Sequence, residues 1–169
     1  LHDEFVARFT KAVESAAVGD PFEDVLMGPL LDRKFATRYE AFLGWVQPHH
    51  AVYGATGRID RGNARAGFVG EAEAGLFYHP VVVDGVRPGD AIFDEETFGP
   101  IVGIATYRTF AEAIELANAP GYGLSSAVYT TEPDEVFAFR RGISAGMVSV
   151  NNSTSGAEAH LPFGGNGKS

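Results

Sequence analysis

The chain has 169 residues, of which 45% are hydrophobic and 21% charged, which is typical of one globular domain of roughly 100–200 residues. Its net charge of −9 argues against nucleic acid or an anionic membrane as a partner, because both attract basic surfaces. The sequence has no cysteine, which excludes disulfides, thiolate metal sites and a cysteine nucleophile within these residues. It shows no charged leader and no run of about 18 apolar residues, so we expect no signal peptide, no membrane span and a cytoplasmic location.

The first 50 residues predict two helices. Residues 2–17 follow a helical pattern that places Phe5, Phe9, Val13 and Ala16 on one apolar face. Residues 27–31 are interpreted as an irregular connector. Asp32 stands where an N-cap is expected, and the helix after it carries the apolar stripe Phe35, Tyr39, Phe42 and Val46.

The next stretch is less regular. Residues 51–74 are rich in Gly, Ala and charge, which indicates a surface excursion. Residues 76–83 (LFYHPVVV) predict a strand, but Pro80 interrupts it or confines it to a sheet edge because proline cannot donate to a ladder.

After Asp90 the pattern alternates regularly between strands and helices. Strands are predicted at 100–107, 124–130 and 147–150, separated by helices that begin with a Thr109/Glu112 capping box and with a Thr131 cap. This alternation predicts an α/β fold with an open, mostly parallel sheet flanked by helices. We found no internal repeat and no sharp linker, and we therefore expect residues 1–169 to be a single domain.

Two apparent ligand motifs fail on spacing. The ending Gly167-Lys168-Ser169 resembles the end of a phosphate-binding loop, but position 162, where that motif needs glycine, is proline. Among the five histidines, His49 and His50 are adjacent, a spacing that we expect to point their side chains apart rather than onto one metal ion. We therefore predict no metal site.

Two polar segments are better candidates for binding. Asp94, Glu95 and Glu96 lie between apolar residues just before a strand, where a carboxylate can accept hydrogen bonds from a ribose while Phe98 lies against a flat ring. A solvated charge run explains the same pattern. The second segment is the polar loop 152–160, which leaves the carboxyl end of a strand at Asn151, the place where open α/β sheets bind ligands.

The order of the motifs resembles the aldehyde dehydrogenase superfamily. The three most specific are EETFGP at 95–100, NAPGYGLS at 118–125 and PFGG at 162–165, and weaker matches run over the whole chain. The resemblance implies oxidation of an aldehyde to an acid with NAD or NADP, through a thiohemiacetal and a thioester on a cysteine. It also implies a small-molecule aldehyde as substrate and a homo-oligomer, dimeric or tetrameric, as the parent enzyme.

The resemblance also implies roles for individual residues. Glu96 resembles the residue that accepts hydrogen bonds from the nicotinamide ribose, and Phe98 the aromatic residue beside the nicotinamide. Asn151 resembles an asparagine that supports the active-site loops. Substrate contacts are implied for Phe163, which resembles a residue of the aldehyde tunnel, and for an anchor loop that holds the distal carboxylate of semialdehydes: Ser155, Gly156 and Ala157. A carboxylate-bearing semialdehyde is therefore the preferred substrate class.

The departures from the family concern catalysis. In the family the nucleophilic cysteine, the general-base glutamate and most of the nucleotide-binding domain precede the segment matched here, and an oligomerisation strand follows it. We therefore expect the chain to be the catalytic-domain portion of a longer enzyme, with no catalytic residue of its own and no activity alone. Two alternatives remain open: a natural truncated binding or assembly module with the same fold, and a relative of the acylating dehydrogenases or glutamyl-phosphate reductases.

Overall fold

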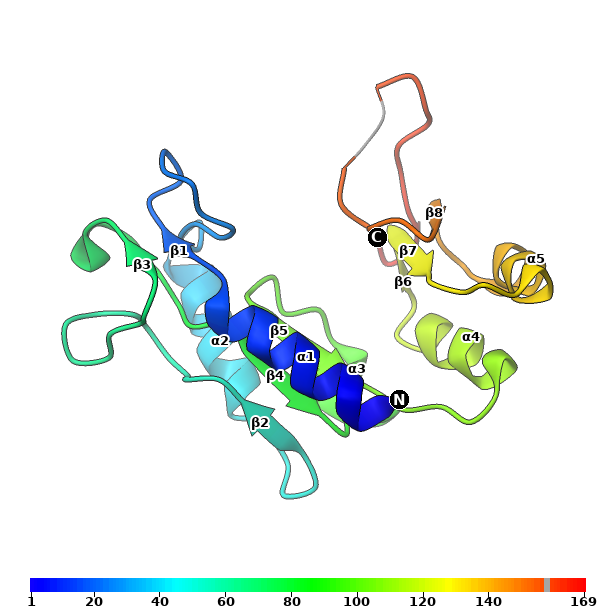
Figure 1. Ribbon diagram of the computed structural model, residues 1–169, viewed down its shortest axis with the longest axis horizontal. Helices are drawn as coiled ribbons and strands as arrows, with labels where there is room; N and C mark the ends of the chain where they lie inside the picture. Colours follow the sequence, from blue (N-terminus) through cyan, green and yellow to red (C-terminus); the bar gives the residue numbers. More distant parts are fainter. Residues whose placement is uncertain (157–158) are drawn as a thin grey trace. The chain divides into compact units, whose positions relative to one another are not determined.

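A computed structural model describes residues 1–156 and 159–169. The chain combines helices with parallel and mixed sheets, which confirms the predicted α/β class, and it divides into two compact units, residues 1–106 and 107–169. Figure 1 shows the first unit from blue to green and the second from green to red. That residues 1–169 make one catalytic domain of a longer enzyme stays a prediction.

The core of the first unit is a three-stranded sheet between two helices (Figure 1). Strand β4 (Val81–Asp84) lies in the middle, antiparallel to β2 (Ala51–Tyr53) and parallel to β5 (Ile101–Ile104). Successive side chains of a strand point to opposite faces. Val81 and Val83 accordingly pack with helix α2 (Arg33–Leu43), whereas Val82 packs with helix α1 (His2–Ser15). The central strand is therefore fully enclosed.

The two helices show how far local sequence determined their packing. Asp32 caps α2 as expected, since its Oδ1 accepts hydrogen bonds from the backbone N–H groups of Lys34 (2.8 Å) and Phe35 (3.1 Å). For α1 the expected face is confirmed at Phe9 and Val13 and wrong at Phe5. Val6 is buried and Phe5 is 53% exposed, because the stripe Val6, Phe9, Val13 has the same helical spacing and meets Val82.

The predicted surface excursion contributes to a smaller core. Strand β1 (Val18–Gly19) pairs in parallel with β3 (Phe68–Val69), which is followed by a short 3₁₀ helix at Ala72–Ala74. Ile59 is 1% exposed and packs with Val18 and Phe77, so this loop is anchored rather than loose. Of the predicted strand at 76–83, only the part after Pro80 is a strand, as the proline suggested.

In the described part of the second unit, residues 107–156 and 159–169, there are two small sheets and two helices. Strand β7 (Ser125–Val128) lies parallel to β8 (Met147–Val150), and helix α5 (Pro133–Gly142) connects them. Strand β6 (Tyr122–Gly123) lies antiparallel to β9 (Asn166–Gly167), and helix α4 (Phe110–Asn118) precedes it. The alternation had suggested one sheet for all three late strands, whereas β5 pairs with β4 in the first unit.

Of the two predicted caps in this unit, one is confirmed. Thr109 accepts a hydrogen bond from the backbone N–H of Glu112 (3.2 Å). Helix α5 instead begins at Pro133 with Glu132 as its cap residue, and Thr130 rather than Thr131 accepts the hydrogen bond from the Glu132 backbone. Proline is well suited to the first position of a helix, where its missing N–H would have no partner. Across residues 1–156 and 159–169, no helix is both long and apolar enough to cross a membrane.

The buried Tyr78 predicts a loss of stability in alkali. Burial, followed by its hydrogen bond to Glu40 Oε1 (2.7 Å), raises the pKa of Tyr78 from 10.0 to about 12. The folded chain keeps this proton while the unfolded chain loses it, so stability falls between pH 10 and 12, by about 2 kcal/mol. Urea unfolding at a series of pH values will measure this, and Tyr78→Phe is expected to flatten the slope. An unchanged slope in Tyr78→Phe would contradict the assignment.

Candidate functional site

In the first unit, the predicted cofactor residues Glu96 and Phe98 lie in one turn held by helix α2. The turn follows the short helix α3 (Ala91–Asp94), and both side chains are exposed, Phe98 to 57%. Arg38 Nη2 donates a hydrogen bond to the backbone carbonyl of Glu96 (2.5 Å), and the Arg38 guanidinium lies 5.6 Å from the centroid of the Phe98 ring. Phe35 packs against Phe98 as well, with the two ring centroids 5.9 Å apart. Two residues of α2 thus fix this turn.

Phe98 itself has an unusual backbone conformation. Its φ of 53° lies in the left-handed region, which a bulky side chain avoids at a cost of about 1 kcal/mol or more. Such strain persists only where surrounding contacts impose it, and it concentrates at functional sites. The strained backbone of Phe98, with its exposed ring close to the Glu96 carboxylate in sequence, therefore marks this turn as a candidate site.

A cavity of about 450 Å³ lies beside this turn. Phe98, Gly99 and Pro100 form one part of its wall, and Tyr78 contributes another. The rest of the wall comes from residues 27–30, which the sequence analysis interpreted as an irregular connector with a weak family match and no role in binding. The run Met-Gly-Pro-Leu was the available signal, because glycine and proline mark a backbone that follows a specific path.

In the second unit, Asn151 joins the ends of the parallel strands β7 and β8. Its side chain makes a double hydrogen bond with the backbone of Thr130: Oδ1 accepts from the N–H (3.0 Å) and Nδ2 donates to the carbonyl (3.0 Å). Its own backbone N–H donates to Val128 (2.8 Å), and its φ is 52°. Asparagine tolerates this conformation better than most residues. These contacts are those of a residue that supports a loop, which agrees with the predicted role without testing it.

The loop after Asn151 borders a cavity of about 530 Å³. The structure brings three of the predicted substrate residues together in its wall: Ser155, Gly156 and Phe163. Ala157, the fourth, lies outside the described residues. The full lining is Ser125, Gly146, Met147, Val148, Ser149, Asn152, Ser153, Thr154, Ser155, Gly156, Leu161, Pro162 and Phe163. This lining mixes polar and apolar residues, and none of its members among residues 1–156 and 159–169 is charged.

Two residues that sequence reasoning missed shape this cavity. Ser125, the first residue of β7, donates a hydrogen bond from its hydroxyl to the Thr154 carbonyl (3.3 Å) and so ties the loop to the strand. Gly146 gives the backbone of residues 164–165 room to pass, because a Cβ there would stand 1.8 Å from the Gly164 carbonyl oxygen. Both residues belong to short motifs that supported the family resemblance but to which no structural role was given.

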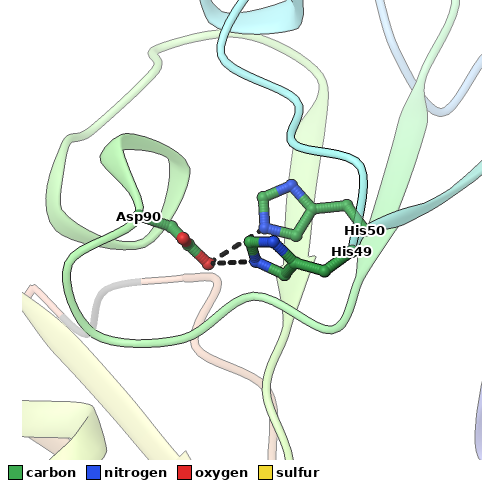
Figure 2. Close-up of side chains that lie close together, drawn as sticks. All are labelled: His49, His50 and Asp90. Carbon is green, nitrogen blue, oxygen red and sulfur yellow. Dashed lines mark hydrogen bonds and ion pairs between the residues drawn. The ribbon is translucent and has the colours of Figure 1, made fainter.

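The histidine pair differs from what was expected. His49 and His50 do not point apart: both Nε2 atoms lie against the same oxygen of Asp90, Oδ2, at 3.0 Å and 2.9 Å (Figure 2). The Arg87 backbone N–H donates to this oxygen as well (3.0 Å). The hydrogen bond from His50, with that from His49 and the backbone, lowers the pKa of Asp90 to about 2. Asp90 is therefore ionised at neutral pH and accepts hydrogen bonds from both imidazoles.

His79, by contrast, has a structural role. Its side chain is buried, its ring Nε2 pairs with the Asn63 carbonyl (3.1 Å), and its own carbonyl accepts a hydrogen bond from the Tyr39 hydroxyl (2.6 Å). These contacts connect helix α2, the loop at Asn63 and the segment that leads into β4.

Comparison with known proteins agrees with these motifs. A model of the aldehyde dehydrogenase family matches residues 1–169. The chain is 34% identical over 165 residues to the α-ketoglutarate semialdehyde dehydrogenase of Haloferax volcanii, covering 98% of this chain and 33% of that protein. It is 33% identical to the human mitochondrial aldehyde dehydrogenase, covering 98% of this chain and 30% of that one.

Solved structures lead to the same family. The betaine aldehyde dehydrogenase of Staphylococcus aureus, in complex with NAD⁺, superposes with a TM-score of 0.84 at 27% identity, over 98% of this chain and 31% of that one. The chain thus spans about a third of the length of the proteins it matches. With its full length matched by the family model, the chain belongs to the aldehyde dehydrogenase family.

Proposed function

We propose that this chain supplies the nicotinamide-side and aldehyde-side contacts of an NAD(P)-dependent aldehyde dehydrogenase that oxidises an aldehyde to an acid. The family match over all 169 residues carries the proposal. The two candidate sites support it, because one presents a carboxylate and an aromatic ring and the other a cavity lined by both hydroxyl-bearing and apolar residues. We further propose a homo-oligomeric parent enzyme. A cytoplasmic location stays a prediction.

The turn at Glu96 and Phe98 fits the nicotinamide end of the cofactor. An exposed carboxylate accepts hydrogen bonds from the two hydroxyls of a ribose, and an exposed phenyl ring offers a flat apolar face. Arg38 and Phe35 hold both residues in place before any ligand arrives, which lowers the entropy cost of binding. When bound, NAD(P)⁺ supplies the acceptor for the hydride of the aldehyde.

The cavity in the second unit fits a small aldehyde with a distal carboxylate. Its volume, about 530 Å³, is in the range of small-molecule sites. Its described wall includes the hydroxyl-bearing residues Ser153, Thr154 and Ser155 but no acidic side chain to repel a carboxylate. Ser153 and Ser155 already share a hydrogen bond between their hydroxyls (2.7 Å), which pre-orders this part of the loop. A semialdehyde therefore remains the proposed substrate class.

Chemistry on this substrate needs a group that the chain lacks. Acyl transfer through a thioester requires a thiolate, and the 169 residues contain no cysteine. The chain alone is therefore expected to produce no NADH from NAD⁺ and any of a panel of semialdehydes. NADH production above the rate without protein would contradict this expectation.

The assembled function is tested in a chimera. This chain replaces the corresponding third of the Haloferax semialdehyde dehydrogenase, and NADH formation is measured with the semialdehyde of that enzyme. An active chimera in which Glu96→Gln lowers kcat/KM by about tenfold, near 1.4 kcal/mol, supports the cofactor contact. The matched control is Glu95→Gln, an exposed acid next to it, which should leave activity unchanged. A folded but inactive chimera favours the non-catalytic module, and equal effects of the two variants contradict the role of Glu96.

A further inference from the structure

We propose that His49, His50 and Asp90 bind a divalent transition-metal ion such as Zn²⁺. One ligand atom from each residue lies within 4.8 Å of the other two, and Figure 2 shows both imidazole rings directed at the carboxylate. Two imidazoles and one carboxylate form a donor set that binds zinc, with positions left open for water. This site is independent of the proposed dehydrogenase function.

The distances suit an ion with little rearrangement. Each Nε2 atom is 2.9–3.0 Å from Asp90 Oδ2. Neighbouring ligands bound tetrahedrally to zinc at about 2.1 Å are themselves about 3.4 Å apart. Each Nε2 atom therefore has to move only about 0.4 Å further from the carboxylate oxygen to admit an ion.

Burial and backbone contacts hold the ligands in place. The side chain of His50 is completely buried, that of Asp90 is 11% exposed, and that of His49 is 32% exposed, which leaves an approach on the His49 side. The Arg87 backbone N–H donates to the same carboxylate oxygen, Oδ2, and so orients the carboxylate. Such supporting hydrogen bonds orient metal ligands and strengthen binding.

Binding has one identifiable cost at His50. Its Nδ1 accepts a hydrogen bond from the Gln47 backbone N–H (3.0 Å). Coordination through Nε2 moves the ring proton to Nδ1, so this hydrogen bond is lost. Gln47 is exposed, and water can take the freed N–H. The backbone N–H of Gln47 should therefore respond to metal although it is not a ligand.

His2 shows that a histidine next to two carboxylates does not by itself form a metal site. His2 also contacts two acids, Asp3 through Nδ1 (2.9 Å) and Asp84 through Nε2 (2.9 Å). The two nitrogens lie on opposite edges of the ring, so these acids cannot meet at one ion. His2 therefore provides a control with the same chemistry and a different geometry.

The test is a Zn²⁺ titration of the 169-residue chain by calorimetry, with amide NMR. We expect one ion per chain, a micromolar or tighter dissociation constant, and a shift of the Gln47 amide signal. His49→Ala, in the more exposed ligand, and Asp90→Asn should each weaken binding at least about tenfold, whereas His2→Ala and His160→Ala should not.

Two results would overturn the proposal. The first is no binding at about 100 μM Zn²⁺, which would leave the three residues as a hydrogen-bonded cluster only. The second is binding that persists unchanged in His49→Ala and Asp90→Asn. If Asp90→Asn unfolds, shown by circular dichroism, His49→Ala decides the question, since its partly exposed ring can be removed at less cost to the core.

Discussion

Gly146→Ala is expected to destabilise the second unit by about 3 kcal/mol or more, the range reached when a core is overpacked against backbone. The added methyl group would stand 1.8 Å from the Gly164 carbonyl oxygen, 2.7 Å from its carbon and 3.1 Å from the Gly165 Cα. All three are backbone atoms, so no side chain can rotate away to make room. Residues 164–165 would have to move away from Gly146, which lines the 530 Å³ cavity just before β8.

Gly164→Ala is the matched control, because a Cβ there meets no atom within 4 Å. Gly164 is the residue that Gly146 contacts, and Gly164→Ala should change the free energy of unfolding by no more than about 1 kcal/mol. Hydrogen exchange of the backbone N–H groups in β7 and β8 measures the stability of this unit directly. Equal protection in the two variants would show that the close approach at Gly146 has no energetic consequence.

Tyr39→Ala is expected to cost the first unit about 3–5 kcal/mol, the usual price of removing a fully buried large side chain. The Tyr39 side chain is fully buried, its ring centroid lies 4.8 Å from that of Tyr78, and its hydroxyl donates to the His79 carbonyl. Tyr39→Phe keeps the ring and leaves that carbonyl without its donor, so a smaller loss of about 1–3 kcal/mol is expected.

The single tryptophan makes this measurement specific to the first unit. Trp45 contacts Phe42, with ring centroids 4.7 Å apart, at the end of the helix that carries Tyr39. Trp45 fluorescence during urea unfolding therefore gives the free energy of unfolding of the first unit in the Tyr39 variants and in their control. Phe22→Ala, which removes a side chain that is 96% exposed, serves as the control and should stay within about 0.5 kcal/mol. Similar losses in Tyr39→Ala and Phe22→Ala would contradict the assigned core.

Local features of the fold were predictable, and non-local pairings were not. The Asp32 and Thr109 caps depend on residues two or three positions away, and Pro80 acts on its own backbone. The choice between Phe5 and Val6 as the buried residue of α1 depends on Val82, some 76 positions along the chain. Likewise, the alternation of strands and helices predicted the α/β class, but the partner of β5 is set by tertiary packing.

The candidate sites divide in the same way. Glu96 and Phe98 are two positions apart, so a single motif predicts that they lie in the same turn. The contacts of Arg38 with the Glu96 carbonyl and the Phe98 ring were not predicted, because Arg38 is far from them in the sequence. The histidine pair was misinterpreted because its partner, Asp90, lies 40 positions from His50. Adjacent side chains in an irregular segment can point in any direction that the backbone allows, and spacing alone does not reveal it.

The contact at Gly146 also indicates where the cavity that we propose for the aldehyde can be redesigned. At Gly146, which lines the cavity, main chain is pressed against the main chain of Gly164, so any larger residue there is expected to displace the backbone. Leu161 and Phe163 border the same cavity with 57% and 67% of their surfaces exposed. A library that aims to change which aldehydes fit should therefore vary these two positions and leave Gly146 unchanged.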